Sequence, residues 1–402
     1  MTVYLAAVLF FGIITQWVEA RWALTIFQVA LLALATTSVV KRLRSGLPIG
    51  HHPVGLLLAG AAAWGLIQVT VGQTVYPLRT LETTLDWTVN LVAFSLALAL
   101  GQRAKERERF LDSALVFAAV LSLSAIFTLL TSPPGKVFWL FDSSAGVATL
   151  GPFVYKNQYA AFVEVVLPVA MFRAISNRRR WLPYSLVAAM LFGSVVASGS
   201  RGGVVLCFLE MLIVPVIAFA QNRFDGASLA RVLIGNLSLV GVLAAIVGWQ
   251  PLWQRFEEPH PYALRRDLAE SSLQMLHDRP WIGFGLGTWS SAYPGYARYD
   301  DGTFVNQAHN DWVQWAAEGG IPFLMIMLAT AGWTIRPAVR AVWGIGILAI
   351  FLHAVVDYPF QQRPALATFV FALLGILAAE QRSTANYSQA SSESVPILTG
   401  SF

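Results

Sequence analysis

The run GVVLCFLEMLIVPVIAFA at residues 203–220 decides the fold class of this chain. An α-helix rises about 1.5 Å per residue, so roughly 20 apolar residues cross the apolar core of a bilayer, which is about 30 Å thick. Irregular backbone that faces lipid would leave N–H and C=O groups without hydrogen-bond partners. An almost wholly apolar run of this length therefore predicts a membrane-spanning helix.

Eleven further apolar runs flank this one and predict twelve spans in all. They lie at about 2–18, 22–40, 53–71, 84–100, 111–130, 159–175, 182–199, 232–249, 311–330, 341–357 and 365–380. The composition of the 402 residues agrees, because 56% are hydrophobic and only 12% are charged, whereas soluble domains carry about 25% charged residues. This composition excludes a disordered chain, and the single cysteine, Cys207, excludes an intrachain disulfide.

The lysines and arginines collect in short loops, and their placement predicts the orientation of the chain. If the N-terminus is inside and the side alternates at each span, sixteen of the 27 basic residues fall inside. Five of the other eleven lie in one long loop, where charge has little effect on topology, so the short loops hold sixteen against six. Both termini are therefore expected to be cytoplasmic. The net charge of +5 then reflects topology and not nucleic-acid binding.

The spacing of the runs divides the chain into four parts. We expect spans one to nine in residues 1–249, a large outer loop in 250–308, spans ten to twelve in 309–380, and a disordered cytoplasmic tail in 381–402. Within the loop, Tyr262–Arg279 has the pattern of an amphipathic helix, with Leu264, Leu268, Met275 and Leu276 on one side. The predicted fold is an all-α, polytopic integral membrane protein of about twelve transmembrane helices, whose large outer loop contains an amphipathic helix.

Polar groups at membrane depth are expensive, so polar clusters at the ends of the spans are functional candidates. In Gly-Ser-Arg-Gly-Gly (199–203), Arg201 presents fixed donors suited to phosphate oxygens. The alternative is a helix contact of small residues, with the arginine reaching the interface. In the same way, Arg265 and Arg266 either clamp an anion or lie on a solvated face where Arg266 pairs with Glu270.

Two further clusters contain histidine. His309 lies in Asn-Gln-Ala-His-Asn-Asp (306–311), where the loop enters the tenth predicted span, and imidazole suits proton transfer from a hydroxyl. The alternative is a helix cap by an asparagine of this segment beside an exposed histidine. Glu318 follows nine residues later, about 13 Å along a helix, so it cannot pair with His309 on one straight helix. His353 and Asp357, four residues apart, either pair on the eleventh span or form a hydrogen bond between two helices.

The segment AHNDWVQWAAEGGIPFL (308–324) resembles the hallmark segment of the O-antigen ligase and polymerase superfamily. Four other segments agree with the family in the same order. They are NQYAAFVEVVLPVA (157–170), GSRGG (199–203), RRDLAESSLQMLHDRPWIGFGLGTW (265–289) and HAVVDYPF (353–360). The resemblance spans about half of the chain, and the combination of segments is more specific than any one of them.

The resemblance implies an enzyme that transfers a glycan from a polyprenyl (undecaprenyl) diphosphate carrier to an acceptor hydroxyl at the periplasmic face of the bacterial inner membrane. It implies that Arg201 and Arg265 contact the diphosphate and that His309 activates or positions the acceptor, and Arg266 leaves the choice of loop arginine open. These three are the catalytic candidates. The substrate-binding candidates are Arg266, Lys156, Asn157, Asn310, Asp311, Glu318, His353 and Asp357.

The predicted reaction is a single displacement that inverts the anomeric centre without a covalent glycosyl-enzyme. No metal-ligand pattern stands out, so we expect no metal ion or cofactor, with arginines in the place of a cation. The expected partners are the carrier-linked glycan, lipid A–core or a growing glycan as acceptor, and membrane lipids, without nucleic acid. Ligation to lipid A–core is the first interpretation. The alternatives are a chain polymerase, a protein-glycosylating transferase, a transporter or flippase of the same lipid, and a structural scaffold.

Overall fold

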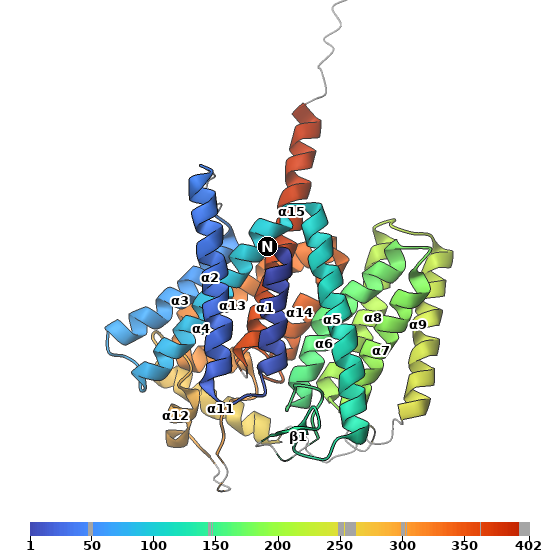
Figure 1. Ribbon diagram of the computed structural model, residues 1–402. Coiled ribbons are helices and arrows are strands. Elements are labelled where there is room, and N and C mark those ends of the chain that lie inside the picture. Colours follow the sequence, from blue (N-terminus) through green and yellow to red (C-terminus); the bar gives the residue numbers. More distant parts are fainter. Residues whose placement is uncertain are drawn as a thin grey trace, which may run out of the picture.

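The computed structural model describes residues 1–46, 51–143, 146, 148–247, 253, 263–298, 302, 304–361 and 363–393, and it is a bundle of helices (Figure 1). The first helices are α1 (Thr2–Thr15), α2 (Arg21–Arg44), α3 (Pro53–Thr70), α4 (Pro77–Gly101), α5 (Ala104–Thr131), α6 (Lys156–Ser176), α7 (Trp181–Ser198), α8 (Arg201–Ala220) and α9 (Gly226–Val247). They are followed by α11 (Ala263–Asp278), α12 (Trp289–Ala292), α13 (Asp311–Arg340), α14 (Ile345–His353) and α15 (Pro364–Glu393). The short elements are the 3₁₀ helices η1 (Tyr293–Gly295) and η2 (Val342–Gly344), and the antiparallel strands β1 (Lys136–Val137) and β2 (Phe141–Asp142).

The lengths of the helices confirm the predicted class, an all-α polytopic membrane protein. Among the described residues, nine helices are long and apolar enough to cross a membrane. Three shorter apolar helices, Thr2–Thr15, Gly226–Gly241 and Val342–His353, account for the remaining predicted runs. Each of the twelve runs thus coincides with a helix, and the number of spans, twelve, stays a prediction.

The outer surface of the bundle is apolar in the way that lipid requires. Along α5, the side chains of Val116, Val120, Leu123, Phe127 and Leu130 are all exposed. They recur every three or four residues, so they form one stripe on the helix. An exposed stripe of large apolar side chains suits a surface that faces acyl chains and not water.

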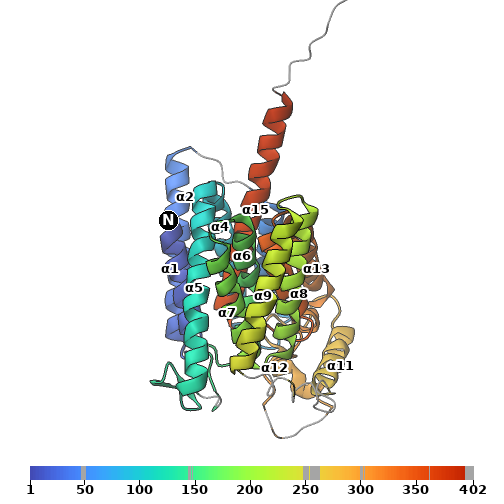
Figure 2. The same ribbon diagram turned by 90° about the vertical axis from the view of Figure 1, so that its right-hand side faces the viewer.

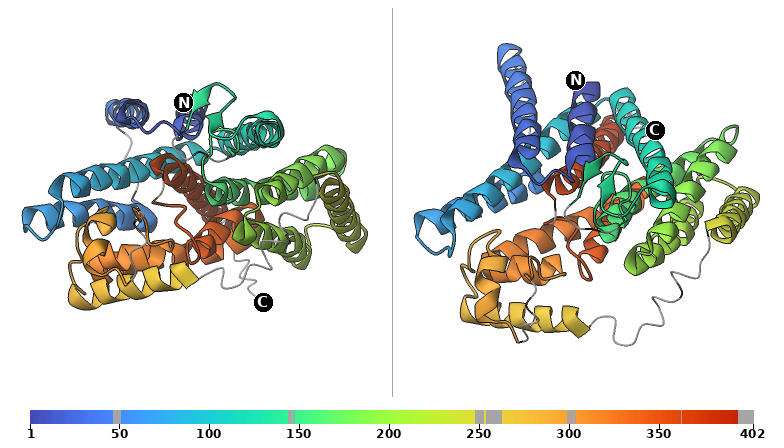
Figure 3. Two further views of the ribbon diagram at one scale, coloured as in Figure 1. Left: turned by 90° about the horizontal axis from the view of Figure 1, so that it is seen from below. Right: turned by 60° about the horizontal axis from the view of Figure 1, so that its bottom comes forward.

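The centre of the bundle is formed by α6 and α15, the two most buried of the long helices. Viewed along the bundle (Figure 3), α15 lies in the middle, where it packs on α4, while α6 packs on α7, α8 and α14. Glycines permit this close approach. A Cβ atom on Gly346 would lie 2.4 Å from the carbonyl oxygen of Glu164, and one on Gly375 would lie 2.4 Å from that of Phe94. Small residues at such contacts are typical of helices packed within membranes.

The two ends of the bundle differ. The N-terminus and the C-terminal part of α15 lie at one end, whereas α11, α12 and the β1–β2 hairpin lie at the other (Figures 1 and 2). The tail prediction needs a correction, because α15 continues to Glu393 and residues 381–393 are helical. No glycine or proline lies between Gly375 and Pro396 to end the helix earlier. Residues 394–402, the rest of the tail, lie outside the described residues.

The predicted tenth span is not a straight helix. Within α13, Gly320 has φ +67° and ψ −172°, which interrupts the helix and turns its first part. The backbone N–H of Ile321 donates to the carbonyl oxygen of Pro280 at 2.7 Å, and that of Gly285 donates to the carbonyl oxygen of Glu318 at 2.9 Å. A Cβ atom on Gly283, where φ is +71°, would lie 2.2 Å from that same oxygen. The segment after α11 is therefore hydrogen-bonded to the kink of α13. This kink lies toward the end of the bundle that carries α11 and α12, which we call the polar end.

Candidate functional site

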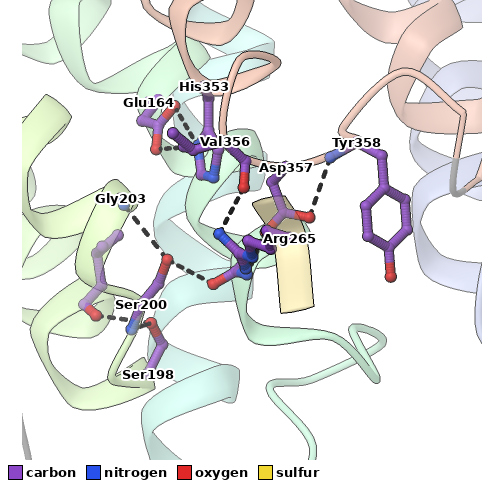
Figure 4. A network of polar contacts seen from close by, with 11 residues as sticks. Glu164, Ser198, Ser200, Gly203, Arg265, His353, Val356, Asp357 and Tyr358 are labelled. Carbon is purple, nitrogen blue, oxygen red and sulfur yellow. Dashed lines mark hydrogen bonds and ion pairs between the residues drawn. The ribbon is translucent and has the colours of Figure 1, made fainter. Parts of the chain in front are cut away.

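Segments far apart in the sequence meet at Asp357 (Figure 4). Its carboxylate accepts hydrogen bonds from the side-chain amide of Asn157 in α6 and from the backbone N–H of Tyr358, the latter at 3.0 Å. Nη2 of Arg265 in α11 lies 3.4 Å from Oδ2 of Asp357. Nδ1 of His309 lies 3.8 Å from the other oxygen, Oδ1, an ion-pair separation that is longer than a hydrogen bond. The carboxylate therefore lies between Arg265 and His309.

The charge of Asp357 is stabilised by its neighbours. Burial by itself raises the pKa of this carboxyl group, because it removes water from the charged form. The contact with His309 and the positive charges of His353 and Arg265 outweigh burial, so the pKa of Asp357 lies below its usual value. Asp357 is a carboxylate at neutral pH and attracts any positive charge that forms on His309.

The first of the two interpretations had His353 pairing with Asp357 on one helix, and the structure does not show that pair. The helix α14 ends at His353, so Asp357 lies in the turn beyond it. Nδ1 of His353 instead lies 2.7 Å from Oε1 and 3.0 Å from Oε2 of Glu164 in α6. Both residues are almost completely buried, with 1% and 0% of their surface exposed. The pair joins α14 to α6 next to the turn that carries Asp357, whose backbone N–H donates to the carbonyl oxygen of His353 at 2.9 Å.

This buried pair yields a test of stability. We expect His353→Leu to lower the free energy of unfolding by about 3–5 kcal/mol, because the Glu164 carboxylate would stay buried without its partner. The double variant Glu164→Leu/His353→Leu should recover most of that loss, since neither member of the pair is then buried without its partner. Thermal unfolding of the purified protein in detergent measures both, with the exposed His51→Leu as the control. A double variant less stable than His353→Leu would contradict this account.

The Gly-Ser-Arg-Gly-Gly motif forms the turn between α7 and α8. Gly199 ends α7 with φ +67°, and the hydroxyl of Ser200 caps α8 by accepting from the backbone N–H of Gly203 at 3.3 Å. That hydroxyl also donates to Oδ1 of Asn157 at 2.8 Å, which links the turn to the partner of Asp357. A Cβ on Gly203 would lie 2.3 Å from Cβ of Ala160. The motif therefore provides the small-residue helix contact and also puts Arg201 at the first position of α8, at the polar end.

His309 has φ +54°, a left-handed conformation that is uncommon outside glycine. It lies next to Asn310, whose Oδ1 caps α13 by accepting from the backbone N–H groups of Trp312 at 3.0 Å and Val313 at 3.2 Å. The imidazole stands edge-on to the ring of Tyr358, with the centroids 4.6 Å apart. The cap and an available histidine are therefore both present. The sequence interpretations treated them as alternatives.

A cavity of about 260 Å³ opens in front of these groups. Its lining includes His309, Asp357, Asn157, His353 and Lys156, the first residue of α6. Five of the predicted site residues thus share one cavity, although they come from three separate segments. Its walls combine an imidazole, a carboxylate and a lysine, which suits a polar substrate with a negatively charged group.

Asp311 and Glu318 were predicted to bind substrate, but in the structure they bind backbone N–H groups of nearby loops. Oδ2 of Asp311 accepts from the backbone N–H of Phe360 at 2.9 Å, so this carboxyl group holds the turn that carries Asp357. The oxygens of Glu318 accept from the backbone N–H groups of Gly287 at 2.8 Å and Trp289 at 3.1 Å. Neither residue lines the cavity around His309. Both residues position loops, as buried hydrogen-bonded carboxyl groups commonly do.

The two loop arginines are distinguished by their place on α11. The side chain of Arg265 is 27% exposed and also donates to the carbonyl oxygen of Val356 (Figure 4). The side chain of Arg266 is 80% exposed and pairs with Glu270 at 3.0 Å. Arg265 therefore faces the site, and Arg266 faces solvent. The predicted apolar side of this helix needs one correction, because Leu264 is 53% exposed.

Two residues of this network were missed by the sequence predictions. Glu164 is the one charged residue within NQYAAFVEVVLPVA (157–170), and a charge inside an apolar run is by itself a signal of function or of pairing. Ser200 precedes the backbone N–H of Gly203 by three residues, the spacing of an N-cap. Both signals were present in segments already selected for other residues.

Together, fold and site define a polytopic membrane protein with one polar site at one end of its bundle, built from arginine, histidine and carboxylate. The family model described as O-Antigen ligase matches residues 186–328, from α7 into α13, and includes Arg201, Arg265 and His309. This match confirms the O-antigen ligase superfamily that the motifs indicated and supports an enzyme of glycan transfer in general. No curated protein matches the chain.

Proposed function

We propose that this enzyme transfers a glycan from an undecaprenyl diphosphate carrier to an acceptor hydroxyl at the periplasmic face, and that the acceptor is lipid A–core. The observation that carries the proposal is the position of the Asp357 carboxylate between Arg265 and His309. A cation for the leaving group and a base for the acceptor are then brought together by one fixed carboxylate, each beside a different oxygen of it.

The arginines act on the leaving group. As the bond between the anomeric carbon and the diphosphate breaks, negative charge grows on the phosphate oxygen, and fixed guanidinium groups stabilise it. Arg265 is held by Asp357 and by the carbonyl oxygen of Val356. Arg201 begins α8, whose N-terminal N–H groups also favour an anion. Their role is that of a divalent cation in other transferases, so activity should persist in EDTA.

His309 acts on the acceptor. Its imidazole takes the proton of the acceptor hydroxyl while the oxygen forms the new glycosidic bond to the anomeric carbon. The carboxylate of Asp357, 3.8 Å from Nδ1, stabilises the imidazolium that results. Inversion of the anomeric centre follows because the oxygen attacks from the face opposite the diphosphate. Asn157 fixes Asp357 from α6 and is itself fixed by Ser200.

The inner membrane and the orientation belong to the same proposal. The excess of basic residues in every second loop supports cytoplasmic termini. The N-terminus and the C-terminal part of α15 lie at the end of the bundle opposite α11 (Figure 1). With the termini inside, the Asp357 site faces the periplasm, where carrier-linked glycans are consumed by this family.

The experiment is a transfer assay with purified protein in liposomes. It receives undecaprenyl-diphosphate-linked glycan with lipid A–core or without added acceptor, and EDTA is present throughout. We expect lipid A–core to gain glycan in the wild type and not in Arg201→Ala. Ladders of longer carrier-linked glycan without lipid A–core would instead support a polymerase. Movement of labelled lipid between leaflets without either product would replace the enzyme by a transporter.

A further inference from the structure

A second and larger cavity lies beside the Asp357 site. Its volume is about 630 Å³, and its walls come from the ends of α1, α2, α4 and α15, from residues 287–291 and from residues 304–307. We call it the α1–α4 cavity. Its size is within the range of small-ligand sites. Neither Arg201 nor Arg265 is among the described residues that line it, so it is separate from the arginines proposed to hold the diphosphate.

Buried amides in this cavity lack partners. Gln16, at the end of α1, lines the cavity and is only 7% exposed, yet neither its side-chain nitrogen nor its oxygen has a hydrogen-bond partner. Gln361 also lines the cavity, and its Nε2 is buried without a partner while its Oε1 accepts from Gln314 at 2.7 Å. Buried amides in folded proteins are almost always hydrogen-bonded. Unpaired donors and an acceptor in one cavity indicate a ligand rich in hydroxyl groups.

Aromatic rings complete the lining. Tyr76 and Phe304 are 48% and 81% exposed, and the buried Trp87 also contributes to the wall. The faces of aromatic rings offer broad apolar surface next to the polar edges of the cavity. A pyranose ring presents the complementary pattern, C–H groups on its faces and hydroxyl groups around its rim. The lining also contains charged side chains of both signs, among them Arg21, Arg79 and Asp86. Amides, charged groups and aromatic rings together suit a saccharide better than a lipid tail.

The two cavities adjoin. Tyr155 and Asn306 line both the α1–α4 cavity and the smaller cavity that contains His309 and Asp357. Within the smaller cavity, His309 lies beside Oδ1 of Asp357, and Arg265 lies beside the other oxygen, Oδ2. A saccharide in the α1–α4 cavity can therefore extend past Tyr155 and Asn306 into the cavity of His309.

We infer that the α1–α4 cavity binds the acceptor glycan, with Gln16 and Gln361 as ligands of its hydroxyl groups; this inference rests on the proposed function. The acceptor O–H gives its proton to His309, and its oxygen forms the bond to the anomeric carbon. The bond from that carbon to the diphosphate breaks, and its electron pair leaves on the phosphate oxygen. The acceptor thus enters from the α1–α4 cavity, past Tyr155 and Asn306, and its hydroxyl group reaches His309 in the adjoining cavity.

Kinetics in the transfer assay test this assignment. Gln16→Leu and Gln361→Leu should each raise the KM for the acceptor about tenfold, the usual effect of losing one hydrogen bond to a ligand. The KM for the donor should not change. Gln274→Leu is the matched control, because Gln274 is exposed on α11 and lines neither cavity. Unchanged acceptor KM in both folded variants would overturn the inference while the proposed function stood.

Binding without reaction separates the two proposals. Lipid-free oligosaccharide released from lipid A–core, or from the carrier-linked glycan, is titrated calorimetrically into the full-length protein in detergent. One of the two should bind, and which one distinguishes a ligase from a polymerase. Ser291→Trp places bulk at the exposed rim of the cavity and should abolish binding even if the glutamine variants fail to fold. If the wild type bound the oligosaccharide but showed no transfer activity, and Ser291→Trp abolished the binding, the cavity assignment would stand and the proposed reaction would be refuted. If Ser291→Trp left the binding unchanged, the cavity assignment would be refuted.

Discussion

Arg265→Ala is expected to lower kcat about 100–1000-fold, the usual loss when one fixed donor to a developing anion is removed. The guanidinium of Arg265 is oriented before substrate arrives, by the carbonyl oxygen of Val356 and by Asp357 at 3.4 Å. Little reorganisation is then needed when charge develops on the leaving phosphate. Arg265→Lys keeps the charge and loses the planar pair of donors, so it should restore only part of the activity.

The neighbouring arginine supplies the control. Arg266→Ala removes the same side chain one position along α11, where it is 80% exposed and paired with Glu270. An exposed pair of this kind contributes little, so activity should stay within about threefold of the wild type. Single-turnover rates with saturating donor and acceptor measure both variants. Equal losses in Arg265→Ala and Arg266→Ala would show that α11 as a whole matters and that Arg265 has no specific contact with the leaving group.

His309→Ala is expected to lower kcat about 100–10,000-fold, the range that a positioned acid–base group contributes. Asp357→Asn should cause a loss through the same step, because the imidazolium would lose the carboxylate that stabilises it. The two changes should not be additive, since His309 and Asp357 act as a unit. Transfer rates of the two single variants and of the double variant give this coupling.

Two further measurements make the role of His309 specific. Carrier-linked donor should bind His309→Ala as tightly as the wild type, because the arginines are unchanged. His277→Ala is the matched histidine control, since the side chain of His277 is 88% exposed on α11. If His309→Ala retained wild-type kcat, or if it lost donor binding in parallel with kcat, the assignment of His309 to the acceptor would be wrong.

The sequence alone was enough for the class of protein and for local features. Apolar runs of about 20 residues predict helices because lipid offers the backbone no hydrogen-bond partners, and each of the twelve runs coincides with a helix. Caps are local as well. Asn310 bonds to backbone N–H groups within three residues, so the sequence was sufficient to suggest this cap; the cap by Ser200 is equally local, although the sequence predictions missed it. The motifs around Arg201 and His309 pointed to the superfamily for the same reason, because each is continuous in the chain.

Tertiary structure alone decided which polar residues meet. Asp357 contacts Asn157 and Arg265, which are 200 and 92 residues away, and His353 pairs with Glu164 and not with Asp357. Helical periodicity determines the side of its own helix on which a residue lies, but not the neighbouring helix that covers that side. Apolar surfaces in lipid are nearly equivalent, so neighbours are selected by the fit of small residues such as Gly203 and Gly346. That fit depends on the shapes of two helices at once, and neither helix specifies it alone.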